Sequence, residues 1–187
     1  MQLNKMLPTL INLIMFVAIP VGIQNSATAL DSNQKYPDNL TLLNKNQIAL
    51  NDTYIGPNRD FEIMMPGIIT KNEIYELTSV SSNKTVYTMI NTDFPEASRI
   101  PIPQIRQILQ SAMRETIGLT GKVIKSTNLE IDNYPGLELL MQHSDGSLGQ
   151  YRAFVVNQRL YFMGALTPDE LTTESVNFFD SFRVYPE

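Results

Sequence analysis

The sequence contains no cysteine and no tryptophan, and its single histidine is His143. Without cysteine there can be no disulfide bond, no thiol catalysis, no cysteine-based metal site and no lipidated cysteine. The nucleophile elbow of hydrolases, the phosphate-binding P-loop and the dinucleotide-binding glycine motif are also absent. We therefore expect no enzymatic activity and no bound cofactor, and a fold that is held together by its core alone.

Basic residues are neither abundant nor clustered. The chain has 14 Lys and Arg against 19 Asp and Glu, which gives a formal net charge of −5. A nucleic-acid-binding domain needs a basic face, and attraction to an anionic membrane surface needs a polybasic segment. The charge pattern therefore predicts neither a nucleic-acid partner nor binding to an anionic membrane surface.

Residues 1–29 have the pattern of a secretory signal peptide. Lys5 is their only charged side chain, an apolar run follows at 6–23, and Ala27-Thr28-Ala29 supplies the small residues that signal peptidase accepts. An uncleaved membrane anchor is the alternative, because the run approaches the ~20 residues that span a bilayer. We expect cleavage, an exported protein, and no integral membrane segment after cleavage.

Two further segments follow the signal peptide. Residues 30–58 are polar, rich in asparagine and interrupted by proline and glycine, which predicts a flexible N-terminal arm with at most a short strand near 47–55. Residues 59–187 carry the regular hydrophobic patterns of one folded domain. Its length suffices for a sizeable core.

The patterns in this domain predict an α+β fold. Period-two alternation and turn signals predict seven strands: 61–67, 74–80, 85–90, 121–132, 137–143, 149–156 and 159–166. Polar turns are expected at 81–84 and 133–136. Apolar residues at helical spacing predict a helix at about 103–118, with Pro103 in its first turn.

The last predicted hairpin is apolar on both faces. Its two-residue turn, Asn157-Gln158, predicts a register that pairs Val155 with Leu160 and Ala153 with Phe162. In the second strand Leu160 and Phe162 lie on one face, while Tyr161, Met163 and Ala165 lie on the other. Such a strand belongs in the middle of a sheet that is covered on both sides.

The end of the chain supplies the second cover. Thr167 as N-cap, Pro168 at the first position and Glu170 at the third predict a helix at about 168–182. Its apolar stripe consists of Leu171, Phe178, Phe179 and Phe182. These phenylalanines could also be an exposed hook for a partner. The need to cover the sheet favours burial, and hence an α/β/α sandwich with a central antiparallel sheet.

Three short stretches resemble the PsbP-like family. They are FEIMMPG at 61–67, NQRLY at 157–161 and SFRV at 181–184. The family comprises the photosystem II extrinsic protein PsbP, its lumenal relatives and exported bacterial proteins of the DcrB type. The resemblance implies an α/β/α sandwich and a non-enzymatic accessory protein acting on a larger membrane complex, in a periplasm or thylakoid lumen. The chain lacks the lipoprotein cysteine that bacterial members often carry.

Four residues form the best candidate metal site: His143, Asp145, Asp132 and Glu130. Imidazole and carboxylate ligands suit zinc or manganese, and Glu130 and Asp132 would share one face of a strand. The alternative is that His143 ends a strand and Asp145 stabilises the following turn.

The sequence thus favours an exported accessory protein that contacts a membrane protein complex or another exported protein. The alternative is a module that binds a small ligand or a metal ion.

Overall fold

The computed structural model describes residues 53–117 and 121–185. The predicted signal peptide and most of the predicted arm therefore lie outside the described residues. The elements in chain order are β1 (Thr53–Ile55), β2 (Phe61–Met64), β3 (Ile68–Asn72), β4 (Glu76–Val80), β5 (Val86–Asp93), η2 (Pro95–Arg99), α2 (Ile102–Ile117), β6 (Lys122–Ile131), β7 (Tyr134–Gln142), β8 (Leu148–Val156), β9 (Arg159–Thr167), α3 (Thr173–Asp180) and β10 (Arg183–Val184).

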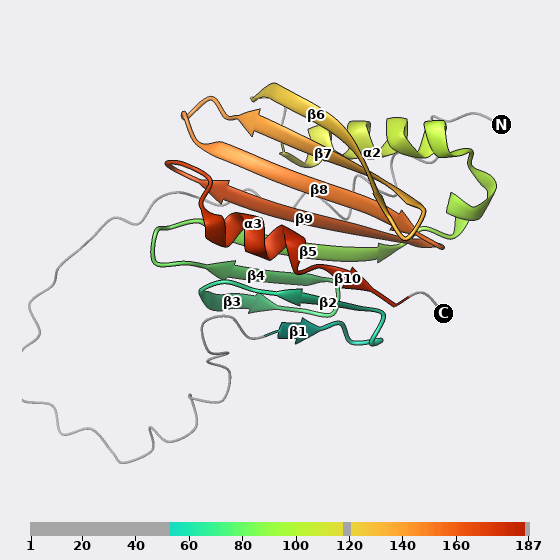
Figure 1. Ribbon diagram of the computed structural model, residues 1–187, viewed down its shortest axis with the longest axis horizontal. Helices are drawn as coiled ribbons and strands as arrows, with labels where there is room; N and C mark the ends of the chain where they lie inside the picture. The colour runs from blue at the N-terminus through green and yellow to red at the C-terminus, as the bar shows by residue number, and fades with distance from the viewer. Residues whose placement is uncertain (1–52, 118–120, 186–187) are drawn as a thin grey trace, which may run out of the picture.

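The strands form two antiparallel sheets (Figure 1). The larger sheet has seven strands in the order β3-β4-β5-β9-β8-β7-β6, and the smaller one has the order β1-β2-β10. The prediction of an α+β fold with mostly antiparallel strands is therefore confirmed. The smaller sheet was not predicted, and it contains the strand that the sequence predicts at 61–67. Because β1 pairs with β2, the described fold also includes the last residues of the expected arm.

Strand β9 occupies the centre of the larger sheet, between β5 and β8. The predicted register of its hairpin is confirmed, since Val155 lies opposite Leu160 and Ala153 lies opposite Phe162. Asn157 has a φ of 53°, the left-handed conformation that a two-residue hairpin turn requires and that asparagine tolerates.

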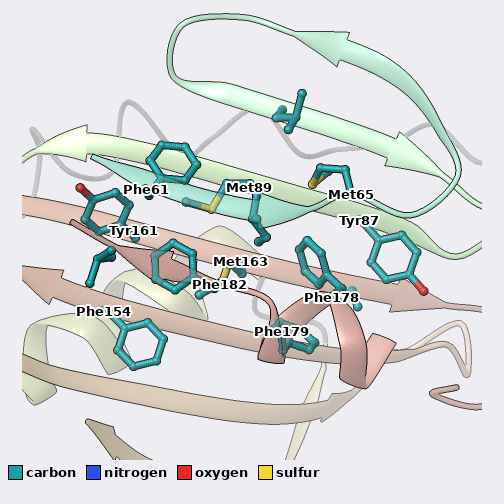
Figure 2. Packing of buried hydrophobic residues seen from close by; sticks show 14 of the residues in the cluster. Phe61, Met65, Tyr87, Met89, Phe154, Tyr161, Met163, Phe178, Phe179 and Phe182 are labelled. Atoms are coloured by element: carbon teal, nitrogen blue, oxygen red, sulfur yellow. The ribbon is translucent and has the colours of Figure 1, made fainter. Parts of the chain in front are cut away.

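The two faces of the larger sheet carry separate hydrophobic clusters. Leu160 and Phe162 pack with α2, which contacts β7 and β8. Tyr161, Met163 and Ala165 lie on the other face, where α3 and the smaller sheet supply the partner residues. Figure 2 shows this second cluster, in which aromatic and methionine side chains from both sheets and α3 point toward one another. The second cover of the sheet is therefore α3 together with β1, β2 and β10.

The predicted start of the last helix is wrong. Strand β9 continues through Thr167, which is buried and pairs with Leu148, so this residue cannot cap a helix. Helix α3 begins at Thr173 after Thr172, whose side chain makes no capping hydrogen bond. Phe182 lies two residues beyond the helix, yet it is buried in the cluster as predicted.

Two other local predictions need correction. The turn between β6 and β7 consists of Asp132 and Asn133, both with positive φ, and residues 134–136 already belong to β7. Strand β3 was missed because its sequence, IITKN, does not alternate strictly between apolar and polar residues.

The end of the chain is fastened to β2 through Ser181. The Met64 N–H donates a hydrogen bond to Ser181 Oγ at 2.9 Å, and this hydroxyl donates to the Phe178 carbonyl at 2.7 Å. Val184 then pairs with Phe61 in the smaller sheet. The SFRV stretch therefore joins the end of α3 to the smaller sheet.

Candidate functional site

The four residues of the candidate metal site lie at opposite ends of β6 and β7. Glu130 and Asp132 are at the β6–β7 turn, whereas His143 and Asp145 are in the β7–β8 loop. Because β6 and β7 are antiparallel along nearly their whole length, the two pairs are about 30 Å apart. The structure does not bring the four together, and no three His, Asp or Glu side chains within 53–117 and 121–185 form a group that could hold a metal.

The surroundings of His143 and Asp145 match the alternative interpretation. Asp145 Oδ1 accepts hydrogen bonds from the Ser147 N–H at 3.0 Å and the Ser147 hydroxyl at 2.6 Å, and these bonds lower the pKa of Asp145. His143 Nε2 lies 2.9 Å from the Tyr151 hydroxyl. Burial lowers the pKa of His143. Asp145 thus stabilises the turn, and His143 pairs with a core tyrosine.

An ion-pair network centred on Arg159 connects three strands. Arg159 Nη1 lies 2.5 Å from Asp60 Oδ2, and Arg159 Nη2 lies 2.9 Å from Asp93 Oδ1. The Tyr161 hydroxyl donates to the same Asp60 oxygen at 2.6 Å. Burial alone would raise the pKa of Asp60, but the hydrogen bonds from Tyr161 and Arg159 outweigh it and lower this pKa. The network ties the start of β2 to β5 and β9, which is a structural task.

This network predicts a pH dependence of stability that Tyr161→Phe reduces. The pKa of Asp60 is lower in the folded state than in the unfolded state. The ionised Asp60 therefore stabilises the fold above the unfolded-state pKa of about 3.9, and this stabilisation is lost as the pH falls through the folded-state pKa. Removing one hydroxyl donor is expected to cost about 1.5 kcal/mol at pH 7. The variant should then lose less stability than the wild type between pH 5 and pH 2, measured by urea unfolding.

Tyr134→Phe is the matched control for this measurement. The Tyr134 hydroxyl donates to Asn157 Oδ1 at 2.7 Å and touches no carboxylate through that bond. It should lower stability by a similar amount at every pH in the range. The same pH dependence for Tyr161→Phe and wild type would contradict the assignment of the acid sensitivity to Asp60.

The tip of the β3–β4 hairpin presents two adjacent apolar side chains to solvent. Ile74 is 67% exposed and Tyr75 is 49% exposed. Among the described residues, they are the only large exposed apolar residues that are neighbours in sequence. Turn positions usually carry Gly, Pro, Asn, Asp or Ser. Packing in the core does not account for an isoleucine and a tyrosine here, because both side chains are exposed. The turn geometry does not account for them either, because neither residue has a positive φ that would restrict the choice of residue.

The tip is held in a defined conformation. Glu73 and Glu76 exchange two backbone hydrogen bonds around it, at 2.8 and 3.3 Å, and the Asn91 N–H donates to the Tyr75 carbonyl at 3.0 Å. Lys71 Nζ lies 2.7 Å from Glu76 Oε2 and 3.4 Å from Glu73 Oε2, which partly neutralises the charges beside the tip. The sequence pattern placed Ile74 and Tyr75 inside a strand, so this surface was missed. We define it as the hairpin tip, Ile74 and Tyr75.

The described residues contain no helix that is long and apolar enough to cross a membrane. No protein-family model matches the chain. No curated protein matches it either.

Solved structures do resemble the chain. The solution structure of cyanobacterial PsbP from Synechocystis sp. PCC 6803 matches with a TM-score of 0.52 and 11% identity, over 74% of this chain and 94% of that one. A protein from Bacteroides thetaiotaomicron matches with a TM-score of 0.48 and 9% identity, over 74% of this chain and 50% of that one. A protein of unknown function from Pseudomonas aeruginosa matches with a TM-score of 0.38 and 12% identity, over 64% and 83% of the two chains.

At such low identity a structural match shows the fold alone. The match to cyanobacterial PsbP agrees with the resemblance in the sequence. The chain therefore has a PsbP-like fold.

Proposed function

We propose that the protein is an exported, non-enzymatic accessory protein that acts by contact with another protein, through the hairpin tip. The observation that carries the proposal is the exposure of Ile74 and Tyr75 on a turn that backbone hydrogen bonds close. Aromatic and aliphatic side chains that insert into a pocket of a partner supply much of the energy of a protein interface. A preformed turn loses little conformational entropy when it binds.

Two further features support the place of action and the kind of partner. The signal-peptide pattern of residues 1–29 favours export, to a periplasm or a thylakoid lumen. The short stretches that resemble the PsbP-like family favour a membrane protein complex as the partner. Since folds are shared by proteins with different functions, the exposed hairpin tip is stronger support for a protein contact than the fold is.

A pull-down from the native membrane fraction tests this proposal. The wild-type chain is expected to recover a defined partner complex, and Ile74→Ser/Tyr75→Ser is expected to reduce the recovered amount at least tenfold, because both apolar anchors are lost. Since both side chains are exposed, the variant should keep the melting temperature of the wild type to within about 2 °C.

Ile124→Ser/Val176→Ser is the matched control, because it also removes two half-exposed apolar side chains, from β6 and α3. It should recover the partner like the wild type. Equal recovery by the tip variant and the wild type would exclude the hairpin tip as the contact. Recovery of monomer alone by the wild type under gentle conditions would refute the accessory role itself.

A further inference from the structure

A row of apolar side chains crosses half of the larger sheet at the opposite end of the β3–β4 hairpin from the tip. Ile68 in β3 lies opposite Val80 in β4, Val80 lies opposite Val86 in β5, and Val86 lies opposite Leu166 in β9. Directly opposite residues of antiparallel strands share a face. We define these four residues as the apolar row.

The apolar row lies on the face of the sheet that α2 covers, but outside the part that α2 reaches. Val86 shares its face with Ile90, which belongs to the α2 cluster. The row continues through Gly149 to Met141 and Val123, and these last two do pack into that cluster. Helix α2 contacts β7 and β8, which lie at the other half of the sheet.

The four residues of the row are not part of either core cluster. Ile68 is 61% exposed, and the other three are only half-buried. Four aligned β-branched or leucine side chains form a continuous apolar strip about 15 Å long, from the spacing of neighbouring strands. An aligned strip of this kind favours a covering segment more than scattered exposed residues do.

The described chain begins in the smaller sheet, on the opposite face of the larger sheet from the apolar row, so the preceding segment reaches the row around the edge strand β3. Thr53, its first residue, lies opposite Met64 in the smaller sheet, and only three residues separate Met64 from Ile68. The start of β1 is therefore within about 20 Å of Ile68. Figure 1 shows that β1 and β3 run in the same direction.

The sequence just before Thr53 has the composition that such a strip needs. Residues 40–50 read LTLLNKNQIAL, with six apolar residues in eleven: Leu40, Leu42, Leu43, Ile48, Ala49 and Leu50. Eleven extended residues reach up to about 37 Å, more than twice the length of the strip. Lys45 is the one charged residue among them.

We propose that residues 40–50 of this chain dock on the apolar row and cover it. This inference is independent of the proposed function, because the hairpin tip and the apolar row lie at opposite ends of the hairpin. The docked segment replaces solvent over the four apolar side chains of the row, which lie on β3, β4, β5 and β9. Covering the row in this way requires no other protein.

The absence of cysteine from the whole chain allows a clean cross-linking test. Cysteine is placed at position 43, 46 or 48 and paired with Val86→Cys in the full chain. The matched control pairs the same positions with Thr92→Cys, which lies on the same strand and the same face as Val86, six residues further along. Both Val86 and Thr92 are half-buried.

Under mild oxidation of dilute protein, at least one of the three positions is expected to form an intramolecular disulfide at least fivefold faster with position 86 than with position 92. Adding Leu40→Ser, Leu42→Ser and Leu50→Ser should remove this preference, and circular dichroism should show that all variants remain folded. Equal rates for positions 86 and 92 at all three sites would overturn the proposal. Dimer formation through Val86→Cys alone would overturn it as well, in favour of a second copy as the cover.

Discussion

Replacing Phe182 with alanine is expected to lower the free energy of unfolding by about 3–5 kcal/mol. Phe182 is only 3% exposed, and its ring centroid lies 5.6 Å from that of Tyr161, 5.9 Å from Phe154 and 6.2 Å from Phe61. These three neighbours come from β9, β8 and β2, so one side chain connects both sheets to the end of the chain. The truncation removes apolar contacts with both sheets and leaves a cavity between them.

For a domain of this size, that loss corresponds to a decrease of about 10 °C in the melting temperature. Val176→Ala is the control, because Val176 lies on α3 and is 48% exposed; its melting temperature should change by less than about 2 °C. An unchanged melting temperature for Phe182→Ala would show that this ring is not part of the core, and would restore the interpretation of the C-terminal phenylalanines as a hook for a partner.

Replacing Gly67 with alanine is the second substitution for which we expect a large effect, about 3 kcal/mol of lost stability. Gly67 has a φ of 79°, and a Cβ atom there would lie 2.3 Å from the Val80 carbonyl oxygen and 2.6 Å from the Ser81 Cα. Both contacts are with backbone, which cannot rotate away. Pro66-Gly67 is the corner where the chain passes from the smaller to the larger sheet, so the clash would push this corner away from the end of β4.

Gly146 provides the matched control for this substitution. It has a similar φ of 87°, but a Cβ atom there would meet nothing within 4 Å. Gly146→Ala therefore carries only the cost of the left-handed conformation, about 1 kcal/mol. Urea unfolding of both variants measures the difference, which should be about 2 kcal/mol; equal costs would mean that the close approach at Gly67 has no energetic consequence.

Much of the larger sheet could be predicted because its signals are local. The Asn157-Gln158 turn determines its register within a few residues, and the apolar residues on both faces of β9 indicate its central place. The spacing of apolar residues in α2 likewise predicts the helix almost to its ends, at Ile102 and Ile117.

Other features arise from contacts between distant residues and could not be predicted. The smaller sheet pairs β10, which has two residues, with β2, about 120 residues earlier, and no local pattern marks so short a strand. The capping signal at Thr167 was misleading because pairing with β8 extends β9 through that position. The Arg159–Asp60 pair spans 99 residues, so neither partner points to the other in the sequence.

The candidate sites show the same limit. Glu130, Asp132, His143 and Asp145 are close in sequence, but a strand pair separates them into two turns at opposite ends of β6 and β7. The hairpin tip was missed because the apolar residues Ile74 and Tyr75 continue into the pattern of β4. A turn that breaks composition rules becomes visible only when the backbone hydrogen bonds around it are known.

The most direct measurement of the central claim is photo-cross-linking from the hairpin tip in the native cell. A photoreactive amino acid replaces Tyr75 in one variant and Ile124 in another, since both residues are about half exposed. We expect one defined protein adduct from position 75 and none from position 124. No adduct from position 75, or the same set of adducts from both positions, would contradict it.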